Sequence, residues 1–76
     1  MNKIEGDEKK FQKGDSYEAL ENYEAETYIQ FVAGKRYLCV GNANGFVRFQ
    51  CEPAYAGATP QKTGLRGETL KRIFGN

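Results

Sequence analysis

The chain of 76 residues contains no histidine and only two cysteines, Cys39 and Cys51. Without histidine there is no imidazole base to activate a serine or cysteine nucleophile, and no imidazole ligand for a metal. Two cysteines cannot complete a four-ligand zinc site in one chain unless carboxylates or a second chain contribute. We interpret both as small apolar core residues, and we expect no enzymatic activity, no metal and no cofactor.

Long apolar runs are missing too. No run approaches the roughly 18 residues that a membrane span requires, and residues 1–8 lack the apolar stretch of a signal peptide. We therefore expect a cytoplasmic protein with no membrane partner. A core in so short a chain typically supplies only ~3–5 kcal/mol of stability, which leaves open support from a partner or from a homodimer.

Charge is divided unevenly along the chain. Residues 1–33 contain eight acids and four bases, whereas residues 34–76 contain seven bases and two acids, so the net charge of +1 conceals two oppositely charged halves. These halves either attract each other within the fold or present two faces to two kinds of partner.

The first candidate element is an N-terminal helical segment. Asp15 and Glu18 have the spacing of a capping box, and apolar or partly apolar residues follow three or four positions apart, at Leu20, Tyr23, Thr27 and Phe31. This spacing predicts one helical face. The helix is expected to end near Glu26, because residues 27–32 favour a strand.

A short repeat competes with that helix. Residues 11–17 and residues 31–37 both read F-x-x-G-x-x-Y. If the repeat is structural, Gly14 and Gly34 each mark a turn that enters a strand, and the domain is mostly β. This interpretation leads to the alternative fold, a small SH3-like β-barrel.

The clearest signal is a β-hairpin over residues 36–51. Two strand-like runs flank Asn44–Gly45, a dipeptide typical of tight hairpin turns. With a loop of two or of four residues, one face carries Leu38, Val40, Val47, Phe49 and Cys51, and the other carries Tyr37, Cys39, Phe46, Arg48 and Gln50. The first set is more apolar and is expected to face the core. The two cysteines then point to opposite sides, so we expect no disulfide between them.

The remaining segments complete the expected fold. Residues 1–13 are predicted to be a flexible polar leader, and residues 14–76 a single small domain. Within it, residues 52–67 contain both prolines and are predicted to form a long surface loop, and residues 68–74 a short C-terminal helix. The predicted class is α+β: a small twisted antiparallel sheet with the central 36–51 hairpin and the 27–32 strand, packed against both helices.

A protein-binding function is the leading hypothesis. Acids and tyrosines alternate in one segment, a composition typical of contact surfaces, because tyrosine buries area while its hydroxyl stays wet. The residues expected to carry it are Glu18, Glu21, Tyr23, Glu24 and Tyr28. The predicted function is a non-enzymatic binding module or inhibitor that uses this segment, the exposed hairpin face, or both. In its size and style the chain resembles small phage-encoded proteins that block host machinery.

Nucleic-acid binding is the alternative. Residues 45–49, Gly-Phe-Val-Arg-Phe, match the last five positions of the RNA-recognition-motif signature. The resemblance implies aromatic side chains on a sheet face that stack on bases. The residues that would serve are Lys35, Arg36, Tyr37, Phe46 and Arg48. Residues 42–44 depart from the signature, because they lack its basic, glycine and aromatic positions.

Overall fold

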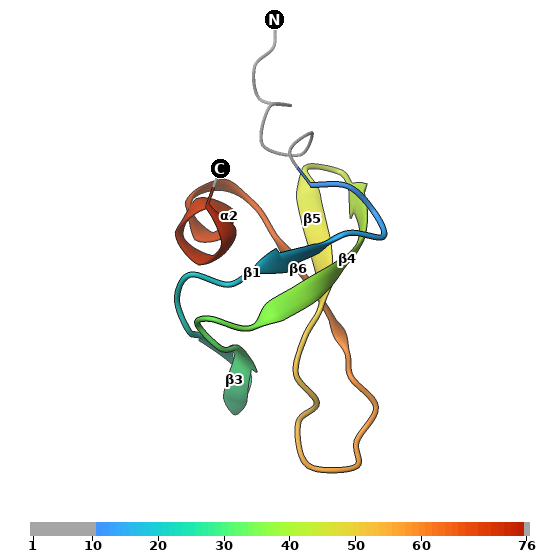
Figure 1. The fold of residues 1–76 in the computed structure, drawn as a ribbon, viewed down its shortest axis with the longest axis vertical. Coiled ribbons are helices and arrows are strands. Elements are labelled where there is room, and N and C mark those ends of the chain that lie inside the picture. Colours follow the sequence, from blue (N-terminus) through green and yellow to red (C-terminus); the bar gives the residue numbers. More distant parts are fainter. Residues whose placement is uncertain (1–10, 76) are drawn as a thin grey trace, which may run out of the picture.

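Antiparallel strands and one short helix make up residues 11–75, the part of the chain that the computed structural model describes (Figure 1). The elements are β1 (Ser16–Glu18), β2 (Tyr23–Ala25), β3 (Tyr28–Phe31), β4 (Arg36–Ala43), β5 (Phe46–Gln50), β6 (Lys62–Leu65) and α2 (Gly67–Phe74). One sheet has the strand order β1-β4-β5-β6, and the other contains β2 and β3. The described fold is thus mostly sheet, with less helix than the predicted α+β class.

The prediction of an N-terminal helix from the capping-box spacing is wrong. That segment contains β1 and β2 instead. Tyr17 pairs with Tyr37 of β4, and Glu18 lies opposite Arg36 rather than at a helix N-terminus. An isolated helix of about 12 residues is marginal in water. Pairing with β4 satisfies the backbone of β1 and packs Tyr17 against the core, and this tertiary gain overrides local helix propensity.

The F-x-x-G-x-x-Y repeat forms the same turn twice, as the competing prediction required. Gly14 and Gly34 have φ values of 97° and 92°, a region that glycine enters without steric cost. Each glycine precedes a strand by two residues. In each turn the residue after the glycine donates a 3.1 Å backbone hydrogen bond to the carbonyl two residues before the glycine.

The side chains of the repeat are equivalent as well. The rings of Phe11 and Tyr17 meet edge to face with centroids 4.9 Å apart, and those of Phe31 and Tyr37 do the same at 4.9 Å. Each tyrosine hydroxyl accepts a 2.8 Å hydrogen bond from the N–H that follows the phenylalanine. The amide of each glycine donates a 2.8 Å bond to the carbonyl two residues after the other copy's tyrosine. The repeat is therefore an approximate twofold unit around the β1–β4 pair.

The predicted hairpin is confirmed, and its turn has two residues. Ala43 pairs with Phe46 across the turn. Asn44 and Gly45 have φ values of 54° and 86°, the conformation that tight hairpin turns require.

A β-bulge reverses the predicted facing of β4. The pairing register shifts between Cys39 and Gly41, so Val40 is an extra residue. One extra residue in a strand moves the side chains beyond it to the opposite face. Tyr37 and Cys39 therefore point into the core, while Leu38 is 40% exposed. The prediction that Leu38 lies inside and Tyr37 outside is wrong for this reason.

The facing of β5 follows the prediction. Val47 and Phe49 are fully buried, and Phe46 and Arg48 are exposed. The bulge has one consequence for the cysteines: both now lie inside, as buried free thiols. Their predicted placement on opposite sides of the hairpin is wrong.

Three other segments agree only in part with their predictions. The strand expected at residues 27–32 is present as β3, but it pairs with β2 in the second sheet rather than with the hairpin. Residues 52–67, predicted as one loop, contain β6, so only the part before Lys62 projects from the body (Figure 1). Most of the predicted leader lies outside the described residues, but Phe11 belongs to the core.

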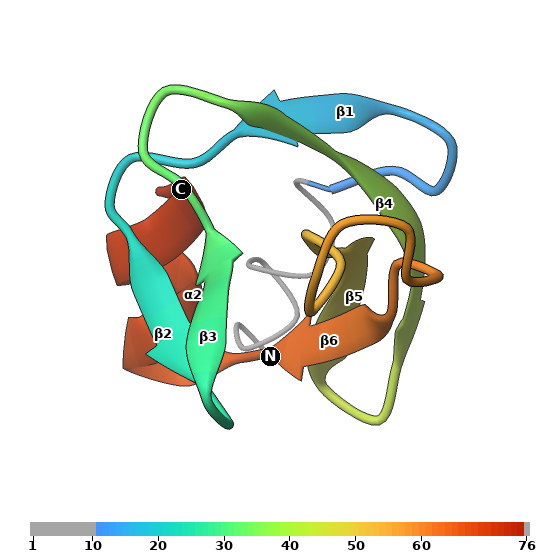
Figure 2. The same cartoon turned by 90° about the horizontal axis from the view of Figure 1, so that it is seen from below.

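The C-terminal helix is confirmed and covers an aromatic core. Leu70, Ile73 and Phe74 are buried, and the ring of Phe74 stacks on Phe49 with centroids 3.9 Å apart. Figure 2 shows the strands around this core, in which the rings of Phe31 on β3 and Phe74 on α2 have centroids 5.2 Å apart. The sheets stay open, so the alternative of a closed SH3-like barrel is not realised.

Candidate binding surface

The side of the sheet opposite the core carries a group of basic residues around one aromatic ring. On β5 and β6 the outward positions alternate with the buried Val47, Phe49 and Leu65. They include Phe46, Arg48 and Lys62, and Arg66 follows β6 directly. We call Phe46, Arg48, Lys62 and Arg66 the basic face. All four are exposed, and no acidic residue occupies an outward position on these two strands.

Glycines flank Arg48 at the centre of the basic face, and the Phe46 and Arg48 side chains lie over Gly64. Arg48 lies opposite Gly41 of β4 and opposite Gly64 of β6, so neither cross-strand neighbour covers it with a side chain. A Cβ atom at Gly64 would lie 3.4 Å from Phe46 and 3.5 Å from Arg48. A glycine within a strand often marks a place where a ligand or another backbone approaches closely.

The charges of the basic face are not neutralised within the described chain. The guanidinium of Arg66 lies 4.9 Å from the centre of the Phe46 ring, a cation–π contact. Among residues 11–75 the ion pairs are Lys35–Glu52 and Glu21–Arg72, and neither includes a residue of the basic face. Only the second pair joins the acidic half of the chain to the basic half. Within residues 11–75 most charges of the two halves are therefore not paired with each other.

A hollow adjoins the basic face at the β4 bulge. It has a volume of about 390 Å³ and is lined by Lys13, Val40, Gly41, Asn42, Ala43 and Arg48. The hydrogen bond from Gly14 N–H to the carbonyl of Cys39 holds the first repeat turn against the bulge. That contact places Lys13 at the same hollow as Arg48, although the two are 35 positions apart in the sequence.

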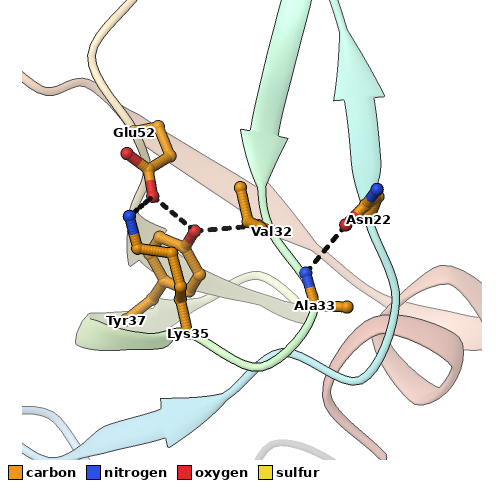
Figure 3. Close-up of polar contacts among 6 residues, drawn as sticks. All are labelled: Asn22, Val32, Ala33, Lys35, Tyr37 and Glu52. Atoms are coloured by element: carbon orange, nitrogen blue, oxygen red, sulfur yellow. Dashed lines mark hydrogen bonds and ion pairs between the residues drawn. The ribbon is translucent and has the colours of Figure 1, made fainter.

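Tyr37, proposed to stack on a base, is instead part of a buried polar network (Figure 3). It is 7% exposed. Its hydroxyl accepts a hydrogen bond from Val32 N–H at 2.8 Å and donates one to Glu52 at 2.7 Å. Burial, and then the hydrogen bond to Glu52, raises the pKa of Tyr37 to about 12. The same bond, followed by Lys35 at 2.9 Å, lowers the pKa of Glu52.

The predicted nucleic-acid residues are thus only partly brought together. Phe46 and Arg48 share the outer face, but Tyr37 points into the core. Lys35 is held by Glu52, and the Arg36 side chain donates to the backbone carbonyl and the hydroxyl of Ser16. Phe46 and Arg48 therefore remain available, and the other three residues have structural partners.

The predicted protein-binding residues do not form a tyrosine-rich surface. Tyr23 is half-buried and packs near Phe31. The Tyr28 hydroxyl lies 3.7 Å from the sulfur of Cys51, and this contact is the first cause of its raised pKa. Glu21 binds Arg72 at 3.1 Å. Glu18 and Glu24 stay exposed, and Glu24 lies opposite Ile29, which is 42% exposed.

Sequence reasoning missed three cationic residues of this region. Lys62 and Arg66 lie within residues 52–67, which were predicted as a loop, and Lys13 was assigned to the leader. Their signal in the sequence is weak: in residues 62–66, Lys-Thr-Gly-Leu-Arg, basic residues stand at the first and last outward positions of one short strand. Such a pattern is too short to distinguish a strand from a loop.

Within residues 11–75 no group of three or more histidine, cysteine or acidic side chains is placed to hold a metal ion. No helix in that range is long and apolar enough to cross a membrane.

Comparison with known proteins adds no family or neighbour. No protein-family model matches the chain, and neither the curated proteins nor the solved structures give a match.

Proposed function

We propose that the protein is a non-enzymatic binding module that engages single-stranded nucleic acid through the basic face. The observation that carries this proposal is the open, unneutralised arrangement of Phe46, Arg48, Lys62 and Arg66 on one side of β5 and β6. Proteins that bind single strands combine cationic side chains, which follow the phosphates, with aromatic rings on which bases stack.

Phe46 is the stacking residue in this proposal. It is 37% exposed, and one edge of its ring lies over Gly64, whose lack of a side chain makes room for it. Arg66 holds its guanidinium over one face of the ring, where it can contact the phosphate next to a base that stacks on the other face. Tyr37 has no role in this proposal, because it is buried. The surface therefore offers one aromatic ring for base stacking, where the sequence predicted two.

Binding of a fluorescein-labelled mixed-sequence 12-nucleotide strand, measured by fluorescence anisotropy between 50 and 300 mM salt, tests the proposal. We expect the affinity to fall steeply with salt, because cations that neutralise phosphates release counterions. Phe46→Leu should weaken binding about tenfold, which corresponds to a stacking contribution of about 1.4 kcal/mol. Lys71→Gln, an exposed change on α2 away from the basic face, is the matched control and should leave the affinity nearly unchanged. No binding by the wild-type protein at 50 mM salt would refute the proposal.

A protein-binding function through the β2–β3 hairpin is the second candidate. It is favoured by the exposed Ile29 beside Glu24, an apolar contact with an acidic rim. In that case Glu24→Lys should mainly slow association with the partner, because rim charges act on the association rate, while binding of the strand stays unchanged.

A further inference from the structure

We propose that the hollow at the β4 bulge is a phosphate subsite, in which Lys13 and Arg48 together hold one phosphodiester group of the bound strand. The inference deepens the proposed function and rests on it, since it names the part of the ligand that this place accepts. Of the residues that line the hollow, Arg48 belongs to the five-residue signature resemblance, whereas Lys13 comes from a different segment of the chain.

The fold builds the hollow through two backbone features. The bulge at Val40 disrupts the pairing ladder on β4, and Gly41 adopts a φ of 146°. A Cβ atom placed on Gly41 would meet no atom of the described residues within 4 Å, so among these residues nothing fills this side of the hollow. Bulges commonly redirect side chains beside functional sites.

Two cations from separate segments converge on this opening. Arg48 enters from β5, directly opposite Gly41. Lys13 enters from the first repeat turn, which the Gly14–Cys39 hydrogen bond fixes to β4. Within residues 11–75 neither cation forms an ion pair, and none of the residues that line the hollow is acidic. An unpaired lysine and arginine facing one opening favour an anion with several acceptor oxygens, and a phosphate satisfies both.

The spacing of the sheet connects this subsite to Phe46. Outward side chains two residues apart on a strand are about 7 Å from each other, so Arg48 and Phe46 are one step apart along β5. A phosphate at Arg48 therefore places an adjacent base within reach of the Phe46 ring. Arg66 lies at the Phe46 ring itself, and Lys62, which lies opposite Gln50, continues the cationic surface beyond Arg48 in the other direction along β5.

The test compares Lys13→Gln and Arg48→Gln with Lys71→Gln in the same anisotropy assay. Each substitution in the hollow should weaken binding three- to tenfold and should reduce the slope of log affinity against log salt by about 0.7, the value for one contact with a single strand. The control should change neither quantity. Lys13 is exposed and makes no described hydrogen bond or ion pair, so its substitution should leave the fold intact.

An abasic strand of equal length separates the phosphate subsite from the stacking contact. The Lys13→Gln effect should persist on the abasic strand, whereas the Phe46→Leu effect should disappear. If Phe46→Leu weakens binding of the normal strand but Lys13→Gln behaves like the control, the phosphate subsite is refuted while the proposed function stands. If Lys13→Gln weakens binding of a poly-glutamate peptide as much as that of the strand, and the two ligands bind equally tightly, the hollow selects carboxylates and the assignment is wrong.

Discussion

Removing a single oxygen from Tyr37 should destabilise the protein more than the same change at its repeat equivalent, Tyr17. Tyr37→Phe keeps the ring that packs against Phe31 but deletes the hydroxyl between Val32 N–H and Glu52. A buried donor left without an acceptor costs about 1–3 kcal/mol, and a hydrogen bond to a charged group contributes about 1.5–3 kcal/mol. Because Glu52 is half-buried and keeps Lys35, we expect a total loss of about 2 kcal/mol.

Tyr17→Phe is the matched control because the repeat gives it the same backbone bond. Its hydroxyl accepts from Gln12 N–H at 2.8 Å, in an exposed position. Water can replace that acceptor, so the expected loss is about 0.5 kcal/mol. For a domain of this size a difference of about 1.5 kcal/mol lowers the melting temperature by roughly 6–12 °C more for Tyr37→Phe.

Urea unfolding followed by far-ultraviolet circular dichroism measures both losses, since the chain has no tryptophan to report by fluorescence. Combining Tyr37→Phe with Glu52→Gln in a double-mutant cycle should give a coupling energy of about 1 kcal/mol. An equal loss for Tyr37→Phe and Tyr17→Phe would refute the reasoning, because it would mean that the Glu52 network adds nothing to the repeat.

Two further predictions follow from individual residues. The pKa of Tyr37 is raised to about 12, so its contribution to stability is fully present below pH 10 and is lost as the pH rises from about 10 to 12; urea midpoints measured across that range should fall further for the wild-type protein than for Tyr37→Phe, and parallel curves would contradict this. Glu26 has a φ of 62° in the β2–β3 turn, a conformation unfavourable for most side chains but adopted by Asn44 in the other hairpin turn. Glu26→Asn should therefore stabilise the protein by about 0.5–1 kcal/mol, with Glu24→Asn in the adjoining strand as the control, and an unchanged melting temperature would show that the turn is not strained.

Local sequence signals predicted the turns and the C-terminal helix because each depends on neighbouring residues. Asn44–Gly45 fixes a tight turn by its tolerance of positive φ. In α2 the apolar spacing of Leu70, Ile73 and Phe74 and the following Gly75 define a short amphipathic helix. The F-x-x-G-x-x-Y repeat also gave correct information, because glycine, phenylalanine and tyrosine each have a defined role in the same turn.

The strands that replace the predicted helix over residues 15–26, and the facing of β4, could not be obtained in this way. Capping-box spacing and glutamate content favour a helix locally, but β1 is stabilised by a partner strand that begins at Arg36. Such pairing cannot be predicted from the residues of one segment alone. The bulge at Val40 has no local signature beyond Gly41, yet it determines which side of the strand every preceding residue faces.

How well the residues of the candidate site could be predicted depended on the same non-local features. Phe46 and Arg48 were found because β5 alternates regularly, so their outward placement follows from period-two spacing. Tyr37 was assigned to the same surface only because an unbulged hairpin would place it there. Lys13 and Arg66 were missed because they reach the surface from a turn and from the end of β6, whose positions depend on the assembled sheet.

The bulge on β4 links the core of the protein to its candidate site. By turning Tyr37 inward it gives the second repeat a buried tyrosine that reaches Glu52, and it removes that ring from the outer face. At the same position the extra residue is followed by Gly41, which leaves Arg48 uncovered and opens the hollow that Lys13 borders. The core side of the bulge therefore contributes to stability, and its outer side contributes to binding. Tyr37→Phe should lower the stability without changing affinity for the strand, and Lys13→Gln should weaken binding of the strand without changing the stability. A variant at either position that changed both properties equally would show that the two sides of β4 are not independent.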